Sequence, residues 1–288
     1  MKMASLPIAR APQKPAEEAA ALGKQERLFA SLRALDSLLV AFSGGADSSY
    51  LAWAAHHALG PRSLAVTALS ASFSRYDREQ AEEFVRATGV RHEFIETREF
   101  ENPLYVANDA DRCYHCKDEL FDRMESLARA RHFAAIAYGI QADDTRDFRP
   151  GHRAAREHRV LAPLLEVALG KDEIRMLARR AGLPAWDRPA SACLSSRIPY
   201  GTPVTPELLE KIDRAEAALR ELGFRQFRVR AHGELARVEL APDELARGFD
   251  PALAQQMAVR LKAVGFSFVT LDLEGYRQGS LHSLLKKK

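Results

Sequence analysis

Cysteine is scarce in this sequence, and long hydrophobic runs are missing. Three cysteines are an odd number, which excludes a closed disulfide framework. No apolar run approaches the roughly 20 residues that a helix needs to cross a bilayer. Residues 1–24 also lack the continuous apolar segment of a signal peptide, and their Ala- and Pro-rich composition predicts a flexible tail. These absences favour a cytoplasmic globular protein.

The net charge is small as well, because 42 Lys and Arg against 39 Asp and Glu leave +3 at pH 7. This balance excludes a nucleic-acid binder that depends on bulk positive charge. With 47% hydrophobic and 28% charged residues, the 288-residue chain has the composition of a soluble protein with a sizeable core. Its length predicts about two domains.

An alternation of short apolar runs and helical patterns over residues 30–185 predicts an α/β fold with a doubly wound parallel sheet. This first domain is expected to cover residues 25–187. Its strands are expected at residues 37–42, 64–69, 93–95 and 133–138. Its helices are expected at residues 48–59, 75–88, 117–131 and 171–180.

The pattern changes after residue 187. Residues 188–206 carry four prolines and predict an extended connecting segment, which contains Cys193. Residues 207–288 are expected to form a smaller α+β domain. Its helices are expected near residues 206–222 and 251–264, and its strands near residues 224–230, 235–240 and 267–273.

A glycine-rich turn, with the sequence SGGADSS at residues 43–49, lies between the first expected strand and helix. Gly44 and Gly45 allow the backbone to approach an anion closely. The amides of such a turn and of the following helix point at the anion. Further donors are the hydroxyls of Ser43, Ser48 and Ser49. Gly-Lys-Ser/Thr is absent, which excludes a Walker loop. The simpler alternative is a helix start capped by Asp47 or Ser48.

The complete Ser-Gly-Gly-x-Asp-Ser string resembles the PP-loop of the ATP pyrophosphatase superfamily, whose members cleave ATP to AMP and pyrophosphate and adenylate a substrate. The resemblance implies that ATP binds to Ser43, Gly44, Gly45, Asp47, Ser48 and Ser49. Asp143 and Asp144 follow the expected strand at residues 133–138. Because ligands gather at the carboxyl ends of parallel strands, we expect this pair to serve the nucleotide and its Mg²⁺. The alternative is a polar loop that caps the next element.

The three cysteines lie in polar segments that contain arginine. Cys113 and Cys116 form a Cys-x-x-Cys pair just before an expected helix, and Cys193 lies in the connecting segment. One interpretation is a redox pair at a helix N-terminus. A second is a structural zinc site with His115 as fourth ligand. A third is an iron–sulfur cluster on three thiolates, which leaves one iron open. Buried inert thiols are the simple alternative.

Four segments together resemble the LarE family, the ATP-dependent pyridinium-3,5-biscarboxylic acid mononucleotide sulfurtransferases. They are the loop at residues 43–49, RCYHCK at 112–117, ADDTRDFRPG at 142–151 and RPASACLSSRIPYG at 188–201. The resemblance runs from about residue 30 to residue 275. It implies a PP-loop domain, a smaller C-terminal domain and a homo-oligomer, commonly a hexamer. It also implies a small pyridinium nucleotide as substrate, and a thiolated precursor of the nickel-pincer nucleotide as product.

The resemblance also implies a chemistry. ATP with Mg²⁺ converts a substrate carboxylate to an acyl-adenylate, and sulfur then attacks the activated carbonyl. In one branch of the family, the cysteine that matches Cys193 gives up its own sulfur and becomes dehydroalanine. Another branch, with three cysteines, is similar to cluster-dependent tRNA thiolases and uses a 4Fe–4S cluster. Because this sequence also carries Cys113 and Cys116, we prefer a 4Fe–4S cluster on all three cysteines, with Cys193 catalytic.

Arginines are expected around a phosphorylated, polycarboxylated substrate, because guanidinium groups suit phosphate and carboxylate. The candidates are Arg197 and the pair Arg228 and Arg230, which share one face of a strand. A solvated strand face is the alternative for the pair. Glu216 matches an acidic position of the family's product or metal site. Three other functions stay open: a cluster-dependent tRNA thiolase, a nucleotide-binding regulator without turnover, and an amidating ATP pyrophosphatase.

Overall fold

The computed structural model of the chain describes residues 15–146, 150–189 and 192–277. These residues form two compact units. Unit 1 consists of residues 15–69, 77–97 and 117–189, and unit 2 consists of residues 70–76, 98–116 and 192–277. Within these ranges, no helix combines the length and the apolar character that a membrane crossing requires.

Unit 2 takes two segments from within the stretch that the sequence assigned to one first domain. Residues 70–76 and 98–116 follow two strands of unit 1 but belong to unit 2. Apolar side chains of residues 98–116 join the core of unit 2, and Leu194 N donates a hydrogen bond to Ser72 O at 2.9 Å. Phe100, Tyr105 and Val106 pack there with residues of the C-terminal part. A boundary drawn along the sequence does not detect such a long-range contact.

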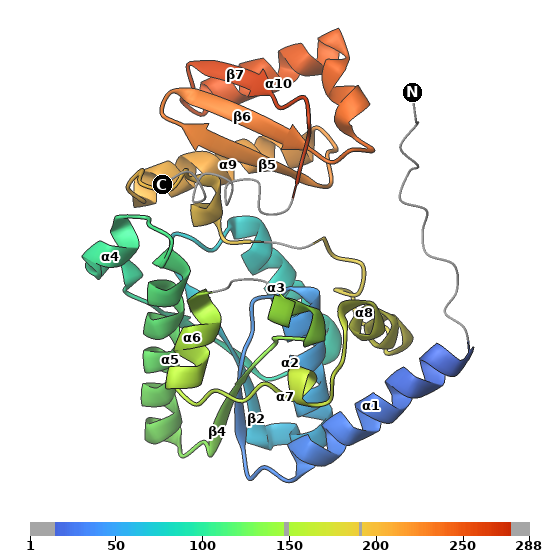
Figure 1. The fold of residues 1–288 in the computed structure, drawn as a ribbon. Coiled ribbons are helices and arrows are strands. Elements are labelled where there is room, and N and C mark those ends of the chain that lie inside the picture. Colours follow the sequence, from blue (N-terminus) through green and yellow to red (C-terminus); the bar gives the residue numbers. More distant parts are fainter. Residues whose placement is uncertain (1–14, 147–149, 190–191, 278–288) are drawn as a thin grey trace. The chain divides into compact units, whose positions relative to one another are not determined.

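Unit 1 contains a parallel four-stranded sheet with the order β3-β2-β1-β4 (Figure 1). Its strands are β1 (Leu38–Ala41), β2 (Ser63–Leu69), β3 (His92–Glu96) and β4 (Ala135–Tyr138). All four residues of β1 are buried, as expected for a central strand covered on both faces. The α/β fold predicted from the sequence is confirmed.

The order of the strands reverses at β1. Helix α2 (Ala46–Leu59) connects β1 to β2, and α3 (Arg75–Thr88) lies between β2 and β3. Helix α5 (Arg112–Arg131) precedes β4, on the other side of β1. Because parallel crossovers are right-handed, α5 covers the opposite face from α2 and α3. The carboxyl ends of β1 and β4 therefore form a topological switch point, the usual place for a ligand in such sheets.

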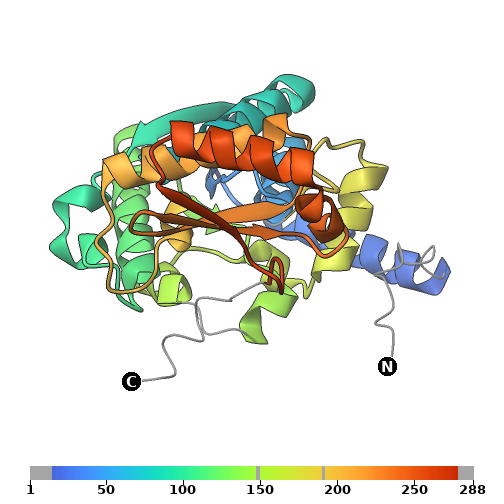
Figure 2. The same cartoon turned by 90° about the horizontal axis from the view of Figure 1, so that it is seen from above.

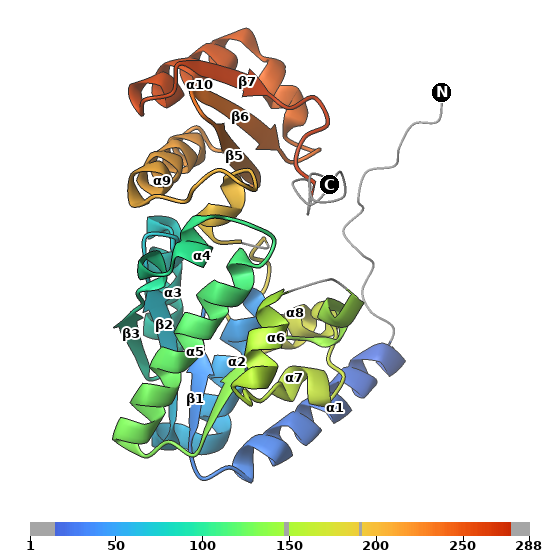
Figure 3. The same ribbon diagram turned by 60° about the vertical axis from the view of Figure 1, so that its left-hand side comes forward.

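Helix α1 (Pro15–Arg33) corrects the expectation of a flexible tail over residues 1–24. Residues 1–14 lie outside the described residues, but the second part of that stretch is helical. Its apolar side chains, Ala21, Leu28, Phe29 and Leu32, are buried in the core of unit 1. Helix α1 packs on α2, α7 (Pro163–Glu166) and α8 (Lys171–Arg180), which Figure 3 shows together with α6 (Pro150–Glu157). Burial against these helices stabilises a segment whose composition alone suggests disorder.

Unit 2 contains a three-stranded sheet with the order β5-β6-β7. β5 (Phe227–His232) pairs antiparallel with β6 (Leu235–Leu240), which pairs parallel with β7 (Phe268–Leu271). Helices α9 (Pro206–Glu221) and α10 (Pro251–Ala263) supply the apolar layer over one face of this sheet (Figure 2). Because side chains alternate along a strand, the core residues of β5 point to this layer, and Arg228 and Arg230 point to the opposite face. The short helix α4 (Pro103–Val106) also belongs to unit 2.

Candidate active site

The loop at residues 43–49 forms a closed turn at the carboxyl end of β1. Helix α2 begins at Ala46, so its N-cap is Gly45, which has an extended backbone and no side chain to cap the helix. The Ser48 hydroxyl donates to Gly45 O at 3.1 Å and accepts from Ser43 N at 3.2 Å. The alternative of a start capped by Asp47 or Ser48 is therefore wrong. No side chain caps the first turn of α2, as in anion sites at helix N-termini.

Ser49 supports the same interpretation. This residue is 1% exposed, and its Oγ has no hydrogen-bond partner among the described residues. A buried hydroxyl without a partner costs free energy, and such a group is typical of a place that a ligand completes. An oxygen of a phosphate group is a suitable acceptor for it.

Gly139, directly after β4, is a site residue that was not predicted from the sequence. A Cβ atom at this position would lie 2.8 Å from Ser48 N, closer than side chains approach backbone. Only glycine lets the end of β4 approach the first turn of α2 so closely. The signal was a glycine at the end of a strand beside the switch point.

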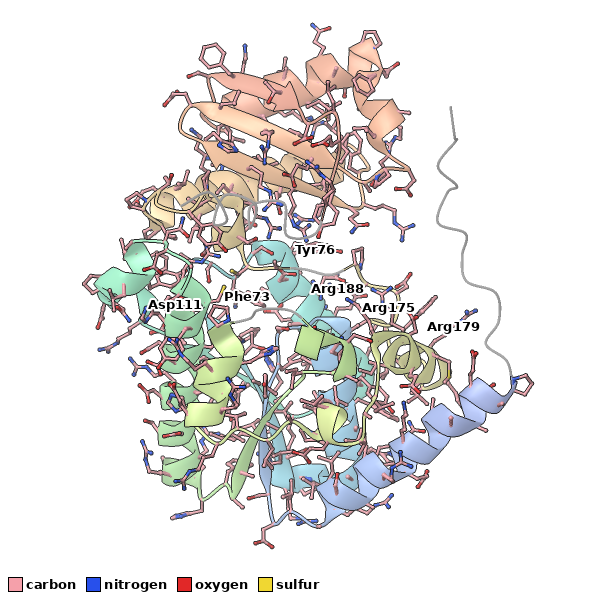
Figure 4. All side chains as sticks on the ribbon, in the orientation of Figure 1. Phe73, Tyr76, Asp111, Arg175, Arg179 and Arg188 are labelled. Atoms are coloured by element: carbon pink, nitrogen blue, oxygen red, sulfur yellow. The ribbon has the colours of Figure 1, made fainter. Side chains whose placement is uncertain are left out.

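Arg188 and Asp77 are two further residues that were not predicted as part of the site. Arg188 Nη1 donates to Gly44 O at 2.6 Å, and Arg188 Nη2 pairs with Asp77 Oδ1 at 2.7 Å. Figure 4 shows Arg188 beside Arg175 of α8, whose Nη2 donates to Arg188 O at 2.8 Å. A buried guanidinium group of unit 1 thus donates a hydrogen bond to a carbonyl of the loop, that of Gly44.

Asp143 has a structural partner. Its Oδ2 accepts a hydrogen bond from Lys171 N at 2.8 Å, at the start of α8, where the N-cap residue Gly170 has no side chain. Asp144 Oδ2 accepts from Gln141 N at 3.4 Å. The alternative of a loop that caps the next element thus describes Asp143, and its role toward ATP and Mg²⁺ stays a prediction.

The three cysteines are free thiols, and all belong to unit 2. The sequence placed Cys113 and Cys116 before a helix, but α5 begins at Arg112, so both lie in its first turns. The polar first turn gave no apolar periodicity by which to find this start. Cys193 directly precedes a 3₁₀ turn, Leu194–Arg197. Cys113 and Cys193 are exposed, and Cys116 is half-buried.

The three thiols interact electrostatically with the same two buried side chains, Arg112 and Tyr105. Burial lowers the pKa of the Arg112 guanidinium, but the charges of Cys193 and Cys113 outweigh burial, and the pKa is raised. The pKa of the Tyr105 hydroxyl is raised by burial first and then by Cys193, with a smaller contribution from Cys116. Arg112 Nη2 lies 3.9 Å from Cys113 Sγ, so the first of these side chains contacts one of the thiols directly.

A single metal ion needs its ligand atoms close together. Among the described residues, the only three His, Cys, Asp or Glu ligand atoms that all lie within 4.8 Å of one another belong to Asp122, Glu125 and His158. The structure thus does not assemble the cysteines with His115 as a zinc site. A cubane cluster spreads its thiolates over separate irons and tolerates a wider spacing.

A clamp of hydrogen bonds joins the two segments that carry the cysteines. Arg112 Nη1 donates to Ser195 O at 2.8 Å and also to Asn108 Oδ1. Asn108 is fully buried, and its Nδ2 donates to Pro199 O at 2.9 Å. The hydroxyls of Tyr105 and Ser195 lie 2.8 Å apart. These contacts fix the segment of Cys193 relative to that of Cys113. No local sequence motif predicts them.

The proposed substrate arginines lie in a buried charged cluster of unit 2. Arg197 pairs with Glu216 through two hydrogen bonds of 2.8 and 2.9 Å, and their side chains are 3% and 1% exposed. Arg230 pairs with Glu239 at 2.8 Å and donates to Ser196 O at 2.7 Å. The guanidinium of Arg228 lies 4.8 Å from the centre of the Tyr276 ring. The alternative of a solvated strand face is wrong, since both strand arginines are buried.

The charges in this cluster influence one another. Burial raises the pKa of the Glu216 carboxyl, but Arg197 outweighs burial and holds that pKa below its usual value. Burial lowers the pKa of Arg228, and the neighbouring Arg197 lowers it further. Arg220 also pairs with Glu216, and Arg237 pairs with Glu239 and Asp272. Five guanidinium groups thus gather near three carboxylates, an arrangement that favours an anion.

Comparisons with known proteins extend over nearly the whole chain. No family model matches it. An uncharacterised protein of Synechocystis sp. is 42% identical over 92% of this chain and 98% of its own length. The pyridinium-3,5-bisthiocarboxylic acid mononucleotide synthase of Lactiplantibacillus plantarum is 33% identical over 92% of this chain and 95% of its own length. One of the subunits of the glutamine-hydrolysing GMP synthase of Archaeoglobus fulgidus is 29% identical over 64% of each chain.

Proposed function

The chain belongs to the family of the pyridinium-3,5-bisthiocarboxylic acid mononucleotide synthase, and from this premise we propose that it transfers sulfur to the carboxylates of pyridinium-3,5-biscarboxylic acid mononucleotide. The observation that carries the proposal is the 33% identity to that synthase over almost the full length of both chains. We further propose that ATP, cleaved to AMP and pyrophosphate, activates each carboxylate. In agreement with the family, we expect a cytoplasmic homo-oligomer, commonly a hexamer.

The activation step uses residues of unit 1. A carboxylate is a poor acyl donor, and attack of its oxygen on the α-phosphorus of ATP gives an acyl-adenylate and releases pyrophosphate. The uncapped amides of α2 and the Ser49 hydroxyl are the donors proposed for the leaving pyrophosphate. Asp47 and Asp143 are the carboxylates proposed to hold Mg²⁺, which offsets the charge of the pyrophosphate when bound.

The sulfur step uses residues of unit 2. We propose that Cys113, Cys116 and Cys193 hold a 4Fe–4S cluster, which supplies an open iron for an exchangeable sulfide when bound. Arg112 balances the negative charge of two of these thiolates, and the clamp through Asn108 keeps Cys193 in place. Arg112 and Asn108 would have these roles whatever the source of the sulfur.

A second sulfur mechanism is favoured by the exposure of Cys193. In this route the Cys193 thiolate attacks the acyl-adenylate, and AMP leaves. A base then removes the α-proton of Cys193, the Cβ–S bond breaks, and the sulfur departs with the substrate as a thiocarboxylate. The residue becomes dehydroalanine, so each chain reacts once.

The substrate is proposed to bind through Arg197, Arg228 and Arg230, with Glu216 holding Arg197 in position. Its phosphate and carboxylates are anions that guanidinium groups bind through charge-assisted hydrogen bonds.

The experiment that tests the function is an anaerobic incubation of the protein with ATP, Mg²⁺, sulfide and the pyridinium substrate. We expect AMP and a substrate in which sulfur has replaced carboxylate oxygen, detected by mass spectrometry. Thiolation of bulk tRNA in place of the pyridinium nucleotide would support the tRNA thiolase. Nucleotide binding without any AMP would support the regulator.

A further inference from the structure

A buried ion pair lies behind the phosphate loop in unit 1. The side chains of Arg188 and Asp77 are 6% and 10% exposed and lie 2.7 Å apart. The other arm of the same guanidinium donates to Gly44 O at 2.6 Å. Since Asp77 balances the charge of Arg188, this pair adds little net charge to the loop. The pair instead fixes the orientation of the Gly44 carbonyl group.

The turn at Gly44 is closely enclosed. Gly44 has φ +73°, a conformation that favours glycine. A Cβ atom at this position would lie 3.0 Å from Arg188 Nη1 and 3.5 Å from the Cβ of Ala81 on α3. At Gly44 the loop therefore packs against both α3 and the guanidinium group of Arg188.

Because the peptide group is planar, a contact that fixes the Gly44 carbonyl also fixes the Gly45 N–H. The carbonyl of Gly44 and the N–H of Gly45 belong to the same peptide group and point in opposite directions. When Arg188 fixes the Gly44 carbonyl toward its guanidinium group, the Gly45 N–H is fixed in the opposite direction, away from Arg188. We propose that Arg188, oriented by Asp77, is a positioning residue that presets the Gly45 N–H for the phosphates of ATP.

This inference rests on the proposed use of ATP, and binding of pyrophosphate tests it directly. Titration calorimetry with magnesium pyrophosphate is performed on the full chain well below its unfolding temperature. R188K keeps the positive charge but replaces the two Nη donors, one for Gly44 O and one for Asp77, with a single nitrogen, so we expect an affinity about tenfold lower. D77N keeps an oxygen that accepts from Arg188, so its affinity is expected to stay within about threefold of the wild type.

A purely electrostatic role makes the opposite prediction. R188K would then bind like the wild type, and D77N, which loses a negative charge, would bind more tightly; this pair of results would overturn the proposal. Leu59→Ala is the matched control for a general loss of stability, because Leu59 is buried at the far end of α2 from the loop. It is expected to lower the unfolding temperature without changing the affinity.

Two further outcomes are separable. If R188K does not fold, D77E takes its place, since it keeps both charges but displaces the guanidinium group; a wild-type affinity of D77E would contradict the proposal. If the wild type binds neither pyrophosphate nor ATP, the proposed function fails, whereas a wild type that binds alongside an unaffected R188K disproves only the positioning role. In steady-state assays, R188K is expected to raise KM for ATP more than it lowers kcat.

Discussion

At the scale of single residues, Ser49 is expected to affect binding and stability in opposite directions. Its hydroxyl is buried without a partner in the described structure, so the free protein bears the cost of that group. Ser49→Ala removes this cost and, by our proposal, also removes a donor to phosphate. We expect an unchanged or higher unfolding temperature together with an affinity for ATP lowered about five- to tenfold. Thermal denaturation and calorimetry measure the two effects separately.

The outcome that would contradict this role is a Ser49→Ala variant that is less stable and binds ATP normally. Ser31→Ala is a suitable control, because Ser31 Oγ donates to Leu28 O within α1, and its loss leaves the loop untouched.

Asp47 is the residue on which release of pyrophosphate is expected to depend most. It lies in the first turn of α2, where we expect its side chain to contact a ligand and to contribute little to the stability of the core. Asp47→Ala is expected to keep the fold and to abolish release of pyrophosphate, measured with a coupled phosphate assay. Undiminished formation of AMP by the folded variant would disprove the assignment.

At the scale of elements, the sulfur mechanism depends on the first turns of α5, which carry Cys113 and Cys116, and on the segment before the 3₁₀ turn, which carries Cys193. If Cys113, Cys116 and Cys193 hold a cluster, Cys113→Ala is expected to lose most of its iron and most of its activity, because two thiolates hold a cubane poorly. Iron and labile-sulfide analysis after anaerobic purification measures the loss. The wild type is then expected to turn over repeatedly with added sulfide.

The second mechanism, in which Cys193 gives up its own sulfur, predicts a different result for the same variant. Cys113→Ala would react once with full amplitude, and intact-mass spectrometry of the wild type would show Cys193 converted to dehydroalanine. That loss of mass in an iron-free wild type would rule out the cluster and leave the family unchanged.

The polar face of the β5–β6 pair carries the prediction for the substrate. Arg228→Ala removes a guanidinium group whose neighbours include Arg197 and Tyr276. We expect KM for the pyridinium nucleotide to rise by tens of fold, with little change in KM for ATP, because a lost charge-assisted contact costs about 1.5–3 kcal/mol. Steady-state kinetics with each substrate varied in turn checks this. An equal loss for both substrates would indicate a folding defect.

At the scale of the whole molecule, two histidines of unit 1 are expected to give stability opposite dependences on pH. Burial, beside the rings of Phe42 and Phe94, lowers the pKa of His92 to about 4. Its neutral form is therefore favoured in the folded state, and stability falls as the pH drops from about 6.5 toward 4, by at most about 3 kcal/mol. His92→Gln, which cannot titrate, is expected to remove this slope in chemical denaturation at a series of pH values.

His158 has the opposite sign. Burial lowers its pKa, but hydrogen bonds to Glu125 at 2.8 Å and Asp118 at 3.1 Å outweigh burial, and the pKa is raised. Its contribution is complete below about pH 6.5, the unfolded value, and is lost as the pH rises through the folded pKa. His158→Gln should therefore cost stability at pH 6 and little at pH 8. Equal losses at both values would show that charge on the imidazole is not responsible.

The sequence predicted regular elements well where burial decides them. The apolar runs of β1 and β2 and the periodicity of α3 were found because a covered strand and an amphipathic helix leave a local pattern. Helix α1 and the start of α5 were missed because contacts with other segments stabilise them. The same division applies to the site. The loop at residues 43–49 is a contiguous string, whereas Arg188 and Asn108 act on partners distant in sequence.

The composition of unit 2 from three stretches of chain has a consequence for synthesis of the protein. Cys113 and Cys116 leave the ribosome before Cys193 and before the strands β5 to β7 that complete their unit. At roughly 5–20 residues per second, the 80 residues from Cys113 to Cys193 take on the order of 4–16 s to translate. During that interval the first two thiols lack the clamp that later surrounds them. Any group that all three cysteines hold together can therefore be completed only after Cys193 has been synthesised, and the first two thiols must stay reduced until then.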